Sequence, residues 1–297
     1  MTLRSVCYSL LRAYVTAGLK FYHRKIIIHG KENIPESPVL FTPNHQNAFM
    51  DALVIVCFHH KPVYFLTRAD IFKSPWAMRV LNFLRMVPIY RIRDGVESLA
   101  KNQETFDRCA ELFKQGNSIV IFPEGNHGSE RRVRPVGKGF TRIVFETLKK
   151  YPPLNLSIIP VGLNYSSPGS FLGGVSIYFG KPLTANRYDM ESRGSANQLR
   201  ADVESSLQQL TMHVDDPSRY ADVLRHLENS GNDFLDPVTT NQRVNEILEG
   251  INPPPASKDR PLHPMQMISR TLSSVINFIP LATWKIIARG IKDPVFT

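Results

Sequence analysis

Short apolar runs alternate with helix-like segments over residues 25–180 of the chain. The apolar runs predict strands at residues 25–29, 39–43, 63–67, 87–91, 118–123, 156–161 and 175–180. The segments between them predict helices at residues 50–57, 76–84, 99–115 and 140–149. Because strands and helices alternate, the pattern predicts an α/β fold in which helices flank a single mixed sheet.

The first 24 residues carry an apolar stripe at helical spacing, formed by Leu3, Val6, Cys7, Leu10, Leu11, Tyr14, Val15, Leu19 and Tyr22. The charges around this stripe are basic, and no acidic residue precedes Glu32. A basic amphipathic helix suits the headgroup layer of an anionic membrane, so we expect residues 1–24 to contact a membrane surface. The alternative is a surface helix that packs on the core. A secretory signal is disfavoured because Arg12 interrupts the apolar stretch.

The C-terminal third has a different composition. After a predicted core at 25–185, residues 186–252 are polar and predict a helical accessory region, and residues 253–259 are typical of a linker. The apolar segment 271–284 carries no charge but contains Pro280. It is too short to span a bilayer, so we assign residues 253–297 to a linker and a membrane-associated segment, with core packing as the alternative for the apolar part.

Charge and cysteine usage narrow the classes of function. The formal net charge is +10 and the three cysteines form no CxxC pair. This excludes a disulfide scaffold or structural zinc site and fits a reducing compartment. A positive charge implies an anionic partner such as nucleic acid, a phosphorylated molecule or an anionic membrane. We expect no nucleic-acid partner, because no DNA- or RNA-binding motif is visible.

The strongest candidate for catalysis is the pair His45 and Asp51. The histidine follows a predicted strand, and the aspartate opens a predicted helix. If the loop folds back, the carboxylate can hold the imidazole N–H, which makes the histidine a general base. The alternative is a loop histidine beside a helix-capping aspartate.

Two further segments suit an anionic, hydroxyl-bearing substrate. Arg91 ends a predicted strand, from which its guanidinium can bind a phosphate through paired hydrogen bonds. Glu124 and Gly125 form a strand-to-loop turn suited to binding a hydroxyl. Four cations follow this turn and predict a phosphate funnel, namely Arg131, Arg132, Arg134 and Lys138. The alternative for both segments is solvated surface charge.

A fourth segment, 158–165, reads as a buried strand that ends in a turn, with Pro160 inside it. It is suited to line an acyl channel, and the alternative is a strand that belongs only to the core. Other common site types are missing from the sequence. Neither GxGxxG nor GxxxxGK[ST] is present, which disfavours a nucleotide cradle. The sequence also has no GxSxG elbow, which disfavours a serine esterase.

Taken in order, these segments resemble the glycerolipid acyltransferase family, which includes lysophosphatidate and glycerol-3-phosphate acyltransferases. The resemblance covers residues 25–185 and rests on Asn44-His45…Asp51, Pro88-Ile-Tyr-Arg91, Phe122-Pro-Glu-Gly125 and Ile159-Pro-Val-Gly162. It implies that His45 takes the proton of the acceptor hydroxyl while Asp51 orients it. It also implies that Arg91 and the Glu124-Gly125 turn bind the glycerol phosphate, and that Pro160 lies near the acyl-binding wall.

The implied reaction moves a fatty acyl group from acyl-CoA or acyl carrier protein to 1-acyl-glycerol-3-phosphate, giving phosphatidate at the cytoplasmic face of a membrane. Because a thioester is already activated, we expect no metal or cofactor. One feature departs from the family: five residues separate His45 from Asp51, where the usual spacer has four. Acceptors such as glycerol 3-phosphate or dihydroxyacetone phosphate are therefore an alternative, as is a catalytically silent lipid-binding protein. The sequence does not predict an oligomeric state.

Overall fold

A computed structural model of the chain describes residues 3–59, 61–90, 101–189, 192 and 194–251. The predicted amphipathic helix is α1 (Leu3–Tyr22). The first half of the core then follows as β1 (Lys25–His29), η1 (Lys31–Asn33), β2 (Val39–Pro43), α2 (Ala48–Phe58), β3 (Val63–Arg68), η2 (Ala69–Ile71), α3 (Pro75–Phe83) and β4 (Met86–Ile89).

The second half of the core begins with a helix that ends as predicted, just before Gly116. Its elements are α5 (Asn102–Lys114), β5 (Ser118–Val120), α6 (Gly139–Lys150), β6 (Ser157–Tyr165), β7 (Gly174–Phe179), β8 (Leu183–Thr184) and η4 (Ala185–Arg187). The remaining described elements are helical: α7 (Ser195–Leu210), η5 (Pro217–Arg219), α8 (Tyr220–Asn229) and α9 (Pro237–Leu248).

The described strands form one eight-stranded sheet in the order β1-β7-β6-β2-β5-β3-β4, with β8 paired to β6 outside this path. The pairs β2–β5, β2–β6, β3–β4 and β3–β5 are parallel. Strands β7 and β8 both run antiparallel to β6. The predicted α/β fold with a single mixed sheet is therefore confirmed. In a parallel sheet the carboxyl ends of the strands meet at one edge, which is where ligands usually bind.

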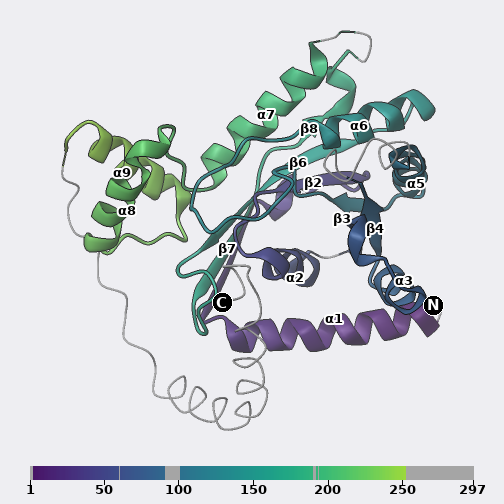
Figure 1. Ribbon diagram of the computed structural model, residues 1–297, viewed down its shortest axis with the longest axis horizontal. Coiled ribbons are helices and arrows are strands. Elements are labelled where there is room, and N and C mark those ends of the chain that lie inside the picture. Colours follow the sequence, from purple (N-terminus) through teal and green to yellow (C-terminus); the bar gives the residue numbers. More distant parts are fainter. Residues whose placement is uncertain (1–2, 60, 91–100, 190–191, 193, 252–297) are drawn as a thin grey trace.

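Helices cover both faces of this sheet (Figure 1): α1, α2 and α3 lie on one side, and α5, α6 and α7 on the other. Alternate residues of a strand point to opposite faces. Accordingly, Leu40 and Ile158 belong to the core cluster that includes α5, α6 and α7. Phe41 and Ile159 belong to the cluster beneath α1 and α2. Among the described residues, no helix has both the length and the hydropathy that a membrane crossing requires.

Two predicted strand ends are wrong, and both lie near the candidate site. The strand predicted at 118–123 ends at Val120, because Pro123 has no N–H for a ladder and a left-handed Gly125 turns the chain. The strand predicted to turn after residue 161 instead runs on to Tyr165. Its antiparallel partner β7 continues the pairing there, with Tyr165 opposite Val175.

The polar region after residue 185 divides into two packing units. Helix α7 buries Leu199, Val203 and Leu207 in the same cluster as α5 and α6. Helices α8 and α9 instead form a separate small cluster around Val223 and Val244. Helix α7 is thus part of the sheet's covering layer. The predicted linker and apolar segment at 253–297 lie outside the described residues.

Candidate active site

The structure brings His45 and Asp51 into direct contact at the carboxyl edge of the sheet. His45 lies in the loop after β2, and Asp51 lies in the first turn of α2. The imidazole Nδ1 is 2.8 Å from Asp51 Oδ2. The Asp51 side chain is completely buried, whereas the His45 side chain is 16% exposed. With Nδ1 bound to the carboxylate, Nε2 is the nitrogen that can take a proton from a substrate.

The loop between the two residues contains an irregular backbone. Ala48, the first residue of α2, has a left-handed φ of 43°, a conformation that side chains other than glycine rarely adopt. The backbone N–H of Asn47 donates to Asp51 Oδ2 at 2.8 Å, so the carboxylate also caps the helix start, as in a capping box. The five-residue spacer therefore still lets His45 and Asp51 meet.

A residue that the sequence analysis missed completes this arrangement. Tyr165, at the end of β6, donates its hydroxyl to Asp51 Oδ1 at 2.6 Å and is fully buried. Burial raises the pKa of Tyr165 well above 10, and the Asp51 carboxylate adds to the shift, so the phenol stays a donor. Asp51 thus accepts hydrogen bonds from His45, Asn47 and Tyr165, which fix the plane of its carboxylate.

We expect Tyr165→Phe to lower kcat about 3- to 10-fold, with little change in KM for either substrate, because the carboxylate loses one of its donors but keeps its charge. Steady-state kinetics of the purified variant measures this. Tyr188→Phe is a matched control, because it removes another tyrosine–aspartate hydrogen bond, 2.7 Å to Asp202 Oδ2, outside the candidate site. Equal kinetics in the two variants would contradict a role for Tyr165 in orienting Asp51.

Aromatic rings fix the plane of the imidazole. Phe122 stacks on His45 with ring centroids 3.9 Å apart and an interplanar angle of 20°. The ring of His127 meets His45 edge-on at 5.7 Å. Because the stacked ring blocks one face, the exposed edge of His45 sets the direction from which a hydroxyl can approach.

Glu124 and Arg134 fasten the following loop to the His45 backbone. Glu124 is 2% exposed and forms an ion pair with Arg134, whose Nη2 also donates to the His45 carbonyl at 2.9 Å. The backbone N–H of His45 in turn donates to Glu124. Burial raises the pKa of Glu124 to about 7, and the Arg134 guanidinium opposes this shift. The geometry gives Glu124 a loop-anchoring contact, and its predicted role in substrate binding remains a prediction.

The predicted phosphate funnel is wrong for two of its four cations. Arg134 is engaged with Glu124, as described above. Arg131 is largely buried and donates to the carbonyls of Tyr165 and Ser166, and its guanidinium lies 4.2 Å from the Phe234 ring centroid. Both arginines therefore satisfy backbone and carboxylate groups of the fold itself. Arg132 pairs with Glu130 at 2.5 Å, and Lys138 is exposed.

The other predicted substrate-binding residues have different positions. Arg91 lies outside the described residues. It follows Tyr90, whose backbone N–H donates to Asn102 Oδ1 and whose carbonyl accepts from Asn102 Nδ2. Gly125 is exposed and has a left-handed φ of 76°. Pro160 is buried in β6, paired with Thr42. No group of three or more potential metal ligands occurs in the described part of the chain.

An apolar pocket with a cavity volume of about 80 Å³ opens between α1 and α2. It is lined by Tyr8, Leu11, Arg12, Val15, Phe49, Ala52, Leu53, Val56, Cys57, Phe65, Leu84 and Met86. Phe49, Ala52, Leu53 and Val56 line it from one face of α2, whereas Asp51 lies on another face of the same helix. Pro160, predicted near an acyl-binding wall, is not among the lining residues.

Comparisons with known proteins agree with this architecture. A family model described as Acyltransferase matches residues 25–164. The chloroplastic 1-acyl-sn-glycerol-3-phosphate acyltransferase LPAT1 of Arabidopsis thaliana is 29% identical over 198 residues, which cover 62% of this chain and 49% of that protein. The 1-acyl-sn-glycerol-3-phosphate acyltransferase of Borreliella burgdorferi is 30% identical over 178 residues, which cover 57% of this chain and 65% of that protein.

The fold also has a solved counterpart. The crystal structure of the 1-acyl-sn-glycerophosphate acyltransferase PlsC from Thermotoga maritima superposes with a TM-score of 0.50 at 17% sequence identity. The superposition covers 73% of this chain and 86% of that chain. At this identity the likeness shows the fold alone. The chain spans about half the length of the plant relative and about two thirds of the bacterial one.

Proposed function

We propose that the chain is a glycerolipid acyltransferase, as its match to the Acyltransferase model and its relatives support. It transfers a fatty acyl group from an acyl thioester to the free hydroxyl of 1-acyl-glycerol-3-phosphate, giving phosphatidate. The observation that carries the proposal is the 2.8 Å contact between His45 Nδ1 and the buried Asp51 carboxylate. It leaves Nε2 of a partly exposed imidazole at the edge of the sheet where substrates bind.

In the proposed reaction, His45 Nε2 takes the proton of the acceptor hydroxyl as its oxygen attacks the thioester carbonyl. The C–S bond then breaks, and the leaving thiolate receives the proton from the imidazolium. Asp51 stabilises the imidazolium between these steps. General base catalysis of this kind contributes about 10²- to 10⁴-fold to the rate.

Arg91 and the Glu124-Gly125 turn are proposed to bind the glycerol phosphate. The described segment 61–90 ends at Tyr90, which is hydrogen-bonded to Asn102. The carbonyl of Pro88 accepts a hydrogen bond from Thr105 at 2.9 Å. These contacts with α5 hold the chain before Arg91 at the carboxyl edge of the sheet. His45 after β2 and Glu124 after β5 lie at the same edge.

The apolar pocket between α1 and α2 is proposed to take the acyl chain of the donor. Its walls are almost entirely apolar, and four of its lining residues come from α2, the helix that also carries Asp51.

We expect Val56→Phe to shift the donor preference toward shorter acyl chains, because Val56 lines the pocket one helical turn beyond Ala52 and a larger side chain there shortens it. The rate with a palmitoyl donor should fall about tenfold, as overfilling a packed site costs about 1–3 kcal/mol. The rate with an octanoyl donor should change little and serves as the internal control. An equal loss with both donors would contradict the assignment.

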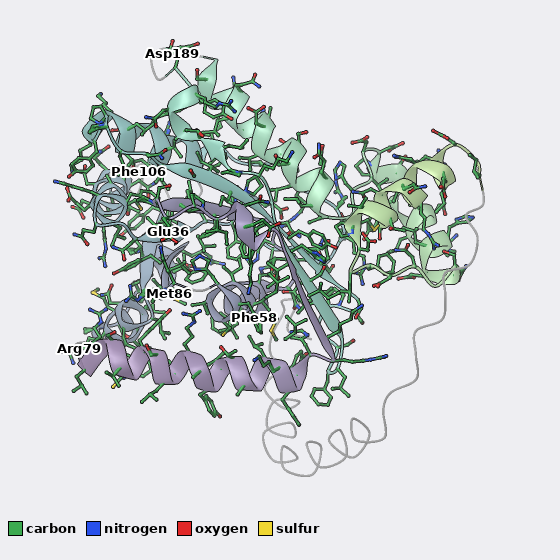
Figure 2. The ribbon with its side chains drawn as sticks, turned by 180° about the vertical axis from the view of Figure 1, so that it is seen from behind. Glu36, Phe58, Arg79, Met86, Phe106 and Asp189 are labelled. Carbon is green, nitrogen blue, oxygen red and sulfur yellow. The ribbon has the colours of Figure 1, made fainter. Side chains whose placement is uncertain are left out.

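Helix α1 is proposed to contact the anionic surface of a membrane at its cytoplasmic face. Its outward side leaves large apolar side chains exposed, namely Leu3, Leu10, Tyr14 and Phe21. Figure 2 shows side chains of α1 projecting away from the body of the molecule. The helix contains Arg4, Arg12 and Lys20 but no acidic residue, which favours anionic headgroups. Membrane association of residues 271–284 remains a prediction.

The deciding experiment is an acyl-transfer assay of the purified protein. Acyl-CoA and acyl carrier protein serve as donors, and lysophosphatidate, glycerol 3-phosphate and dihydroxyacetone phosphate serve as acceptors. We expect lysophosphatidate to be consumed fastest. A preference for glycerol 3-phosphate would support the second candidate, which the five-residue spacer between His45 and Asp51 favours. No transfer with any pair would leave a lipid-binding protein of the same fold.

A further inference from the structure

A second, polar pocket lies at the opposite end of α1 from the candidate active site. Its cavity volume is about 110 Å³, and it is lined by Arg4, Ser5, Tyr8, Tyr64, Phe83 and Arg85. Tyr64 opens β3 and Arg85 precedes β4, so the pocket lies at the amino edge of these strands. The other end of α1 leads to His23, whose ring is 6.3 Å from that of Tyr165. A 20-residue helix is about 30 Å long, which separates this pocket from His45.

Arg85 is held rigidly in this pocket. Its backbone is left-handed, with φ of 61°, and is fixed by hydrogen bonds from its N–H to Asn82 and from Phe65 to its carbonyl. Its guanidinium lies 5.1 Å from the ring centroids of both Tyr8 and Tyr64. Aromatic faces attract the cation but accept none of its in-plane N–H bonds. The donors of Arg85 are therefore positioned for another acceptor.

Arg4 brings a second guanidinium to the same place. Its Nη2 donates at 2.6 Å to the Asn82 carbonyl, which is the acceptor of the Arg85 backbone N–H. Neither arginine pairs with a carboxylate in the described part of the chain, and neither α1 nor α3 contains an acidic residue. Two like charges in one pocket are unfavourable until an anion joins them.

The surroundings indicate what carries that anion. Leu3 and Trp76, on the helices that border the pocket, are 80% and 73% exposed, and Leu10 and Met78 on the same helices are also exposed. Figure 2 labels Arg79 of α3 beside the N-terminal end of α1. An anion site bordered by exposed apolar side chains matches a molecule with a charged head and acyl chains.

We propose that Arg4 and Arg85 form a binding site for the phosphoryl oxyanion of an anionic phospholipid headgroup, separate from the catalytic edge of the sheet. The planar fork of Arg85 and the guanidinium of Arg4 donate to the phosphate oxygens, while Leu3 and Trp76 contact the acyl region. The site fixes the N-terminal end of α1 on the bilayer. The inference rests on the membrane contact proposed above and is independent of acyl transfer.

Vesicle co-sedimentation of the full-length protein tests this site. Vesicles of phosphatidylcholine alone are compared with vesicles in which part of the lipid is replaced by phosphatidylglycerol. The pocket variant R4Q/R85Q is compared with K20Q/R79Q, which removes two basic charges from α1 and α3 outside the pocket. We expect R4Q/R85Q to lose at least about tenfold more affinity for the anionic vesicles than K20Q/R79Q loses. The two variants should bind vesicles of phosphatidylcholine alone with equal affinity.

Three results would overturn the proposal in distinguishable ways. Equal losses in the two double variants would mean that only the general positive field attracts the membrane. Absence of wild-type binding to every vesicle would reject the membrane contact itself. Competition by inorganic phosphate beyond the effect of chloride at equal ionic strength would reassign the site to a soluble phosphate. If R4Q/R85Q does not fold, Arg4→Gln alone carries the test, because it leaves the Arg85 stack intact.

Discussion

Replacing His45 with alanine should lower kcat by about 10²- to 10⁴-fold while the protein stays folded and still binds vesicles. The imidazole is the group whose Nε2 can accept the hydroxyl proton, since its Nδ1 is bound to Asp51. The side chain is partly exposed and forms no part of the apolar clusters, so its loss removes chemistry more than packing. Initial rates at saturating donor and acceptor measure the effect, and circular dichroism checks the fold.

His213 offers a matched control for this substitution. Its side chain is 14% exposed and its Nε2 is 3.1 Å from Asp215 Oδ1, so it is a second partly exposed histidine with an aspartate partner. Its ring contacts the backbone of Val133, outside the pair of His45 and Asp51. We expect His213→Ala to keep kcat within about threefold of wild type. Turnover near wild type in the His45 variant would remove the imidazole from the mechanism.

The part of the site formed by residues close in sequence could be predicted from the sequence alone. A strand, a short loop and an apolar helix between residues 39 and 58 confine His45 and Asp51 to neighbouring positions, whichever details the loop adopts. The order of the four segments also predicted a resemblance to acyltransferases, and a family model described as Acyltransferase matches residues 25–164. In a parallel sheet, residues that follow strands gather at one edge, which brings Glu124 after β5 to the His45 backbone after β2.

Contacts between segments far apart in the sequence could not be predicted from it. Tyr165 and Asp51 are 114 positions apart, and their contact depends on β6 running past the end of its parallel partner β2. Nothing in the run 158–165 marks its last residue as a donor to a buried carboxylate. Arg134 was predicted to belong to a phosphate funnel, because its neighbours in sequence are polar and basic. Its partner His45 is 89 positions away, and only the folded loop places Glu124 between them.

Asp51→Asn separates the charge of the carboxylate from its geometry. The Asn47 N–H and the His45 Nδ1–H both need an acceptor at the Oδ2 position, so the amide oxygen should occupy it. The amide NH₂ then faces Tyr165, whose hydroxyl can rotate to accept a hydrogen bond. The imidazole keeps its tautomer and orientation, but the negative charge that stabilises the imidazolium is lost. We expect kcat to fall about 10²-fold or more, with the urea midpoint close to that of wild type.

Asp51→Ala should lower kcat by a similar factor and also destabilise the fold. It leaves the donors of His45, Asn47 and Tyr165 without their acceptor, and an unsatisfied buried donor costs about 1–3 kcal/mol. Urea unfolding of the two variants distinguishes these effects. If Asp51→Asn keeps most of the wild-type kcat while Asp51→Ala does not, the carboxylate acts by geometry alone and its charge has no part in the reaction.

The double variant H45A/D51N tests whether His45 and Asp51 act as one unit, whatever the kcat of each single variant. Residues that act as one unit have strongly non-additive effects on rate, because the carboxylate can assist only through the imidazole that it holds. We therefore expect H45A/D51N to be no slower than H45A, within about twofold. A further loss equal to that of Asp51→Asn alone would mean that Asp51 contributes to the reaction without His45, and the pair would no longer describe the catalytic unit.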